Sequence, residues 1–337
     1  MVVWKPAPTQ QLSAHYLMAL LHAAGLPPGV INLVTGDGQA VSRVALTHPD
    51  LAGIHFTGST ATFQHLWRTV GEHITGYRGY PRLVGETGGK DFVVAHPSAD
   101  PDVLTTALVR GAYEYQGQKC SAASRAYIPR SVWSRMRDDL IGSTEALTMG
   151  DVSTDLSLFM GAVIDRRAFA KHADAIGRAR TRPGLSVLTG GATDDSTGYF
   201  VQPTVLESAD PTDEIFTTEY FGPILGVHVF EDGAYEQVLA QAADIAPYAL
   251  TGSIIAQDRA AIARASEVLR FSAGNFYVND KPTGAVVGQQ PFGGARASGT
   301  NDKAGSLWNL IRWVSPRTIK ETFAPPTDFR YPYMQEP

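Results

Sequence analysis

The chain has 337 residues, of which 44% are hydrophobic and 18% are charged. At roughly 100–200 residues per domain this length predicts about two domains, and the composition excludes disordered, collagen-like and fibrous proteins. No apolar run approaches the ~18 residues of a membrane span. The 28 Lys and Arg residues against 33 Asp and Glu give a net charge of −5 without a standout basic cluster, which favours a small-molecule partner over nucleic acid. The single cysteine excludes an intramolecular disulfide, no His/Cys cluster has zinc-ligand spacing, and a cytoplasmic location is expected.

The first 85 residues alternate short apolar runs with amphipathic stretches. Apolar side chains in residues 9–24 recur at the spacing of one helix face, and Gly25 followed by two prolines ends that segment. Strands and helices that alternate at this spacing predict βαβ units and a parallel sheet in an open α/β domain. The expected elements are a core strand in 1–6, strands in 30–34 and 51–56, and helices in 9–24, 38–46 and 60–74.

The same alternation continues to residue 278. Residues 282–301 are rich in Gly, Pro and small polar residues, and they predict a long ordered loop of the kind that is usually functional or disordered. In the tail, 307–314 is helical in pattern, and 317–323 alternates as an exposed strand that could pair with a partner chain. The other expected strands are 92–95, 125–128, 186–188, 200–206, 224–230, 252–256 and 274–278, with helices in 101–115, 131–147, 164–180, 235–243 and 259–269.

Cys120 lies in a polar, glycine-containing segment between a predicted helix and a predicted strand. A thiolate is a strong nucleophile, and Lys119 could favour the ionised thiol electrostatically. A buried cysteine that acts as a small hydrophobe is an equally good interpretation at this point. A histidine base is not obvious among the nine scattered histidines, so a Cys-His hydrolase has no support.

Glu86 lies among glycines, where a water molecule or ligand could approach its carboxylate. Such a glutamate can act as a general base if burial raises its pKa. A loop carboxylate that accepts hydrogen bonds from nearby backbone N–H groups remains an equally good alternative. The interpretation of Glu86 as a general base is favoured only when it is considered together with Cys120.

Two glycine-containing turns could hold anions. Residues 56–60 end a strand and open a helix, where N–H groups can bind a phosphate, although the three-glycine dinucleotide pattern is absent. Gly284, Ala285 and residues 291–296 could form a nest of backbone N–H groups for a carboxylate. In both places the glycines could equally serve turn geometry alone.

Four strings occur in the order and spacing of the aldehyde dehydrogenase superfamily, and the chain resembles that family over essentially its whole length. They are Gly-Glu-Thr-Gly-Gly-Lys around Glu86, Gly-Gln-Lys-Cys ending at Cys120, residues 219–223, and residues 291–294. The longer strings in 63–67, 274–280 and 288–302 resemble the Δ1-pyrroline-5-carboxylate dehydrogenases, also called L-glutamate γ-semialdehyde dehydrogenases, of proline catabolism.

The resemblance implies an α/β fold of aldehyde dehydrogenase type. Residues 1–85 would form the C-terminal part of a Rossmann-type NAD-binding domain, and residues 86–290 an α/β catalytic domain with the nucleophilic cysteine. Residues 291–337 would supply an anchor loop, a return helix and an oligomerisation tail. A homo-oligomer is therefore expected, with a proline dehydrogenase as a further candidate partner.

The same resemblance implies NAD-dependent oxidation of L-glutamate γ-semialdehyde to L-glutamate. The Cys120 thiolate would add to the aldehyde carbon, hydride transfer to the nicotinamide would leave a thioester, and Glu86 would activate the water that hydrolyses it. Cofactor contacts would come from Lys5, Gly58, Ser59, Thr60, Ala61, Thr62, Glu219 and Phe221. Substrate contacts would come from Ser121, Gly284 and Ala285, which hold the α-carboxylate, and from Phe292, which packs on the aliphatic chain.

Three departures from the family pattern stand out. Pro8 replaces an acidic residue of many NAD-using relatives, and Ala285 replaces a frequent serine. We also expect an N-terminally truncated relative, without the first cofactor-domain strands and without the asparagine whose amide stabilises the oxyanion; loss of one such donor costs about 10²–10³ in rate. The alternatives are therefore an inactive fragment or pseudo-enzyme that acts only through association, or a dehydrogenase for another carboxylated aldehyde.

Overall fold

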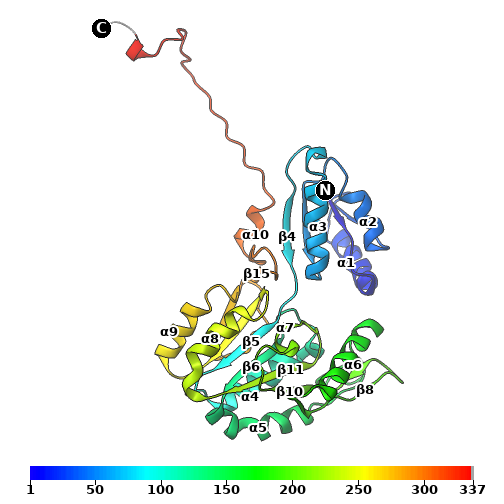
Figure 1. Cartoon of the computed structure of the whole chain (residues 1–337). Helices are drawn as coiled ribbons and strands as arrows, with labels where there is room; N and C mark the ends of the chain where they lie inside the picture. Colours follow the sequence, from blue (N-terminus) through cyan, green and yellow to red (C-terminus); the bar gives the residue numbers. More distant parts are fainter. Residues whose placement is uncertain (335–337) are drawn as a thin grey trace.

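The computed structural model describes residues 1–334. Figure 1 shows a small N-terminal α/β unit and a larger α/β unit, connected through strand β4 (Arg82–Glu86). None of the helices in the described residues is long and apolar enough to cross a membrane.

The N-terminal unit has two pairs of parallel strands. Strand β1 (Val2–Trp4) pairs with β2 (Ile31–Leu33), and β3 (Gly53–Thr57) pairs with β4. Its small core consists of Leu46, Phe63, Leu66, Val70 and Leu83. The helices are α1 (Gln11–Ala23), α2 (Gly38–Ala45) and α3 (Thr60–Glu72), with 3-10 turns at Pro8–Gln10 and Ile74–Gly76.

The prediction of a core strand at the start of the chain is wrong in one respect. The strand forms, but Val2 is 52% exposed and Val3 is 56% exposed. Among the residues that the structure describes, β1 pairs only with β2, so its other edge has no neighbour to cover it.

The larger unit is built on a seven-stranded sheet with the order β14-β13-β5-β6-β11-β10-β7. All neighbours are parallel except β10 and β7, which are antiparallel. The strands are β5 (Asp91–Ala95), β6 (Ala123–Pro129), β7 (Leu185–Thr189), β10 (Thr204–Ser208), β11 (Ile224–Phe230), β13 (Thr251–Ile255) and β14 (Asn275–Val278). Short pairs outside this sheet are β8 (Thr193–Asp194) with β9 (Phe200–Val201), and β12 (Tyr248–Ala249) with β15 (Ala295–Arg296).

Helices cover both faces of this sheet. Along β5, Val93 belongs to the core cluster under α4 (Pro101–Tyr113) and α5 (Arg130–Glu145), whereas Phe92 and Val94 belong to the cluster under α8 (Tyr235–Asp244) and α9 (Arg259–Val268). Alternate residues of a strand point to opposite faces, which explains why these strands read as continuous apolar runs. Helices α6 (Arg166–Thr181) and α7 (Glu214–Thr217) enclose a third cluster.

The tail leaves the body of the molecule after α10 (Leu307–Ile311) and extends far from both units (Figure 1). Residues 317–323, which the structure describes throughout, form no strand, contrary to the alternating pattern. A strand needs a hydrogen-bonding neighbour, and Phe323 in this segment is 92% exposed. A 3-10 turn, Pro332–Met334, lies near the end.

Candidate active site

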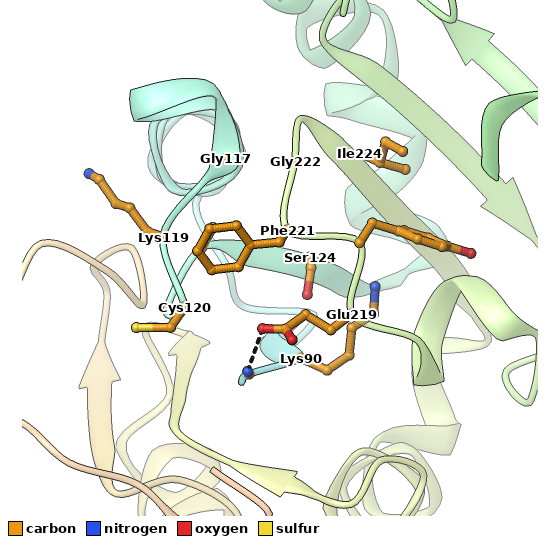
Figure 2. A pocket seen from close by; sticks show the side chains of 12 residues that line it. Lys90, Gly117, Lys119, Cys120, Ser124, Glu219, Phe221, Gly222 and Ile224 are labelled. Atoms are coloured by element: carbon orange, nitrogen blue, oxygen red, sulfur yellow. Dashed lines mark hydrogen bonds between the residues drawn. The ribbon is translucent and has the colours of Figure 1, made fainter. Parts of the chain in front are cut away.

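Cys120 lies at the wall of a cavity, in the segment that connects the end of α4 to the start of β6. This segment contains a strained turn. Tyr115, Gln116 and Gly117 adopt left-handed φ values of 57°, 58° and 63° in succession. A Cβ on Gly117 would lie 2.5 Å from the carbonyl oxygen of Gly222, so this position requires glycine. The turn places Cys120 at the edge of the cavity shown in Figure 2, where its sulfur points away from Phe221 and Glu219.

The surroundings of Cys120 favour the neutral thiol. Burial, together with the nearby carboxylates Asp91, Glu86 and Glu219, raises the pKa of Cys120 to about 12. Lys119 does not offset this effect, because its Nζ pairs with a carboxylate oxygen of Glu114 at 3.0 Å. The expectation that Lys119 favours the thiolate is therefore not supported, and the thiol has to lose its proton before the sulfur can act as a nucleophile.

Glu86 has the environment of a general base. It ends β4, is 8% exposed, and neither of its carboxylate oxygens has a hydrogen-bond partner among the described residues. Burial raises the pKa of Glu86 to about 7, while the charge of Lys303 opposes the rise and that of Asp302 adds to it. The alternative of a carboxylate bonded to neighbouring N–H groups is thereby excluded for this geometry.

Glu219 and Phe221 lie on the loop that precedes β11 and face the Cys120 segment across the cavity (Figure 2). Glu219 accepts a hydrogen bond of 2.8 Å from the backbone N–H of Gly89, and a Cβ on Gly88 would lie 2.5 Å from the same carboxylate. Phe221 is 43% exposed with a left-handed φ of 58°. The Gly-Gly pair after Glu86 therefore allows Glu219 to approach the Cys120 side of the cavity.

Two charged residues of this region were missed by sequence reasoning. Lys90 is 2% exposed, its Nζ has no hydrogen-bond partner in residues 1–334 and lies 4.9 Å from the centre of the Tyr220 ring. Burial, and then the charge of Arg125, lower the pKa of Lys90 to about 7. Asp91 is 1% exposed and accepts hydrogen bonds from the N–H and hydroxyl of Thr251. The available signal was that Lys90 ends the string around Glu86 and that Asp91 follows it directly.

His172, also missed, supports the loop of Phe221. Its Nε2 lies 3.0 Å from the carbonyl oxygen of Tyr220 and 3.1 Å from that of Phe221. A Cβ on Gly222 would overlap the imidazole ring. Burial lowers the pKa of His172, so a neutral ring that donates one N–H to this loop fits the geometry.

The expected cofactor residues of the N-terminal unit lie outside the Cys120 cavity. Gly58, Ser59, Ala61 and Thr62 are exposed around the start of α3, where the Ser59 hydroxyl accepts the N–H of Thr62. The Thr60 hydroxyl accepts a hydrogen bond of 3.3 Å from the N–H of Gly88 and so joins this turn to the segment after Glu86. The Nζ of Lys5 lies 3.3 Å from the position that a Cβ on Gly38 would occupy, at the start of α2.

The expected substrate residues lie on two segments that contact each other. The hydroxyl oxygens of Ser121 and Thr283 are 2.7 Å apart, and both side chains are buried. Gly284 follows with a left-handed φ of 83°, and Ala285 is half-buried. Phe292 is also half-buried, and its backbone pairs with Ala304. Thus Ser121 is brought to the Gly284 turn, whereas none of these four residues lines the cavity between Cys120 and Phe221.

Comparisons with known proteins agree with this architecture. The family described as "Aldehyde dehydrogenase family" matches residues 1–319. The mitochondrial delta-1-pyrroline-5-carboxylate dehydrogenase of Bos taurus is 47% identical over 334 residues, which are 99% of this chain and 59% of the bovine protein.

Solved structures extend the similarity to the fold. The delta-pyrroline-5-carboxylate dehydrogenase of Mycobacterium tuberculosis, in a structure with NAD, is 64% identical with a TM-score of 0.93 and is matched over 61% of its length by 99% of this chain. Proline utilization A of Bdellovibrio bacteriovorus is 31% identical with a TM-score of 0.87, over 97% of this chain and 34% of that one. The chain thus spans about 60% of the dehydrogenases that it matches. It has the aldehyde dehydrogenase fold and belongs to the aldehyde dehydrogenase family.

Proposed function

We propose that the chain oxidises L-glutamate γ-semialdehyde to L-glutamate with NAD, as a step of proline degradation. The observation that carries the proposal is the buried Glu86 carboxylate, which has no hydrogen-bond partner and a pKa of about 7, within electrostatic reach of the single cysteine. A buried base that acts electrostatically on a thiol is suited to the hydrolysis of a thioester formed on that thiol. The similarity to delta-1-pyrroline-5-carboxylate dehydrogenases supports the choice of substrate.

The residues present suit NAD. The exposed start of α3 has the N–H groups of Thr60 and Ala61 without a protein acceptor in residues 1–334, which fits a pyrophosphate. Lys5 would reach the adenosine ribose, and Glu219 with Phe221 would hold the nicotinamide riboside. When bound, NAD would accept the hydride that leaves the aldehyde carbon. Since Pro8 stands where many NAD-using relatives have an acidic residue, this chain's preference for NAD over NADP rests on the relatives.

Cys120 and Glu86 would divide the chemistry between them. The thiol loses its proton to solvent, and the sulfur forms a bond to the aldehyde carbon. After oxidation the acyl group remains on the sulfur as a thioester. Glu86 then takes a proton from a water molecule as the oxygen attacks the acyl carbon, the carbon–sulfur bond breaks, and the thiolate and the carboxylic acid separate.

The end of the substrate that carries the α-carboxylate would be held by the turn at Gly284 and Ala285. The N–H groups of Gly284 and Ala285 donate to no protein acceptor in the described residues, so they are free to bind the α-carboxylate. Ser121 would add its hydroxyl while its oxygen accepts the proton of Thr283. Phe292 would pack on the aliphatic chain.

The test is NADH formation by the purified 337-residue chain with three aldehydes. We expect L-glutamate γ-semialdehyde to be turned over faster than succinate semialdehyde or propanal. Cys120→Ser should reduce the rate by about 10⁴ or more, because the hydroxyl is a far weaker nucleophile at this site. Full activity of Cys120→Ser would overturn the assignment, and preference for succinate semialdehyde would point to another carboxylated aldehyde.

A second candidate is a chain that acts only in association with another polypeptide. It is favoured by the apolar surface of the N-terminal unit, where Val3, Leu12, Tyr16 and Leu20 are each more than half exposed. Under this alternative the isolated chain forms no NADH, and activity appears when the segment that precedes this region in the relatives is added. Activity of the isolated chain would exclude it.

The assembly of the chain belongs to the same proposal. The extended tail, with Phe323 and Phe329 almost fully exposed, supports a homo-oligomer in which the tail packs on a second copy. The similarity to proline utilization A supports a proline dehydrogenase as a functional partner. Light scattering of the chain with and without residues 315–337 tests the first of these, since deletion should lower the assembly mass.

A further inference from the structure

Lys281 lies beside the turn to which the substrate carboxylate is assigned. It follows β14, whose end is fixed by Asn279: the side chain of Asn279 accepts the N–H of Ala256 and donates to the carbonyl oxygen of the same residue, at 2.9 and 3.0 Å. The Nζ of Lys281 lies 3.6 Å from the position that a Cβ on Gly284 would occupy. The ammonium group is therefore held within a few ångströms of the free N–H groups of Gly284 and Ala285.

Glu114 fixes the direction of this ammonium group. Its two carboxylate oxygens accept hydrogen bonds of 2.7 and 2.8 Å from Lys281, and one of them accepts a further bond of 3.0 Å from Lys119. All three side chains are between 23% and 30% exposed, so solvent screens their charges only in part. The hydrogen bonds from the two lysines outweigh burial and lower the pKa of Glu114, which keeps it ionised.

The cluster carries two positive charges and one negative charge. The excess positive charge lies at the Gly284 turn, whereas the carboxylates Asp91, Glu86 and Glu219 act on the thiol of Cys120 and raise its pKa. We propose that Lys281 is the charged residue by which this site selects an aldehyde with a carboxylate at its far end, and that Glu114 acts as the positioning residue for its ammonium group. This inference rests on the function proposed above and names the residue that sets its substrate class.

The single cysteine provides a test that needs neither cofactor nor turnover. Alkylation with iodoacetate, an anion, and with iodoacetamide, its neutral analogue, reports on Cys120 alone. Lys281→Met removes the positive charge and should lower the ratio of the iodoacetate rate to the iodoacetamide rate by about fivefold. Glu114→Gln leaves both lysines without their counter-charge and should raise the same ratio by about fivefold.

The opposite signs distinguish charge selection from a purely structural ion pair. Both substitutions break the same salt bridge, so a role in folding alone would move the ratio in the same direction in both variants. Lys281→Arg keeps the charge and should retain the ratio, which preserves the test if Glu114→Gln does not fold. Lys320→Met, in the exposed tail, is the matched control and should change nothing.

Steady-state kinetics give the second readout. In Lys281→Met, kcat/KM for L-glutamate γ-semialdehyde should fall about tenfold, mainly through KM, while that for propanal changes less than about twofold. An unchanged preference in Lys281→Met, or a shift of the alkylation ratio in the same direction in both variants, would overturn the inference. An inactive wild-type chain would instead count against the proposed function, and the alkylation ratios would still decide the role of Lys281.

Discussion

The two units of the molecule differ in how completely they bury their own strands. In the seven-stranded sheet, every residue of β5 and β13 is buried, and helices pack on both faces. In the N-terminal unit, no residue of β1, β2 or β3 is buried, and the main core cluster has only five buried side chains. The larger unit buries the central strands of its sheet with its own helices, whereas the smaller unit leaves apolar side chains of α1 and β1 exposed to solvent.

This difference separates two parts of the proposed site. Cys120, Glu219 and Phe221 are carried by the well-packed unit, while Lys5 and residues 58–62 are carried by the loosely packed one. Glu86 ends the strand that connects them (Figure 1). We therefore expect the nucleophile to be held more rigidly than the cofactor residues, because local stability follows the density of buried contacts.

The largest effect is expected from leucine truncation in the two cores. Leu108→Ala, at a fully buried position under the main sheet, should lower the free energy of unfolding by about 4 kcal/mol, since a cavity forms where neighbours cannot collapse. Leu66→Ala in the small core should cost about 2 kcal/mol, because this site is closer to solvent. Urea denaturation monitored by circular dichroism measures both, and equal costs would contradict the comparison.

Glycine-to-alanine substitutions make a matched pair with a smaller effect. A Cβ on Gly252 would overlap the ring of Phe92 in the main sheet, and a Cβ on Gly85 would overlap the ring of Phe63 in the N-terminal unit. Gly252→Ala should destabilise by about 3 kcal/mol and Gly85→Ala by about 1 kcal/mol, because Phe63 is 7% exposed in a small core whereas Phe92 is fully buried. Thermal unfolding of the two variants measures both effects. A larger destabilisation by Gly85→Ala than by Gly252→Ala would show that the small core is the more tightly packed one.

The pH dependence of turnover tests Glu86, which ends the strand that connects the two units. Only ionised Glu86 can take a proton, so the rate should fall about tenfold for each pH unit below its pKa of about 7 and level off above it. Glu86→Gln should lack this inflection. Loosening the N-terminal unit with Leu66→Ala should admit water and move the inflection toward the ordinary value of 4.5. A wild-type inflection already at 4.5 would show that the carboxylate is solvated.

The smallest effect is expected from the helix caps. Ser59→Ala removes the side-chain cap of α3. Asp258→Ala removes the cap of α9, because the Asp258 carboxylate accepts hydrogen bonds from the N–H groups of Ala260 and Ala261. Each should cost about 1 kcal/mol. In Ser59→Ala, faster exchange of backbone amide hydrogens should be confined to α3. In Asp258→Ala, faster exchange should extend from α9 into the seven-stranded sheet. Uniform exchange across both units in Ser59→Ala would contradict their independence.

Much of the fold was predictable because its strands and helices carry clean periodicities. The expected strands at 92–95, 224–230 and 252–256 fall within one residue of β5, β11 and β13 at each end. Strand β4 was not assigned, since Gly85 and Glu86 at its end are typical of a loop. The exposure of β1 and the absence of a strand in 317–323 depend on which neighbours are present, and a local pattern does not contain that information.

The site was predictable only where neighbouring residues form a motif. Glu86 and Cys120 each lie in a recognisable string, but the burial of Lys90 and Asp91 contradicts the usual exposure of charged residues. The ion pair between Lys281 and Glu114 joins positions 167 residues apart, and neither residue has a local signal. Such pairs follow from the folded arrangement of segments, which explains why neither Lys281 nor Glu114 was singled out from the sequence.

Trapping the acyl-enzyme shows whether Cys120 carries the acyl group and whether Glu86 is needed to release it. Glu86→Gln is incubated with L-glutamate γ-semialdehyde and NAD, and the digested protein is analysed by mass spectrometry. We expect a glutamyl group on the peptide that contains Cys120, which persists in this variant and does not accumulate in the wild type. Continued turnover by Glu86→Gln without an adduct, or an adduct on any other residue, would contradict it.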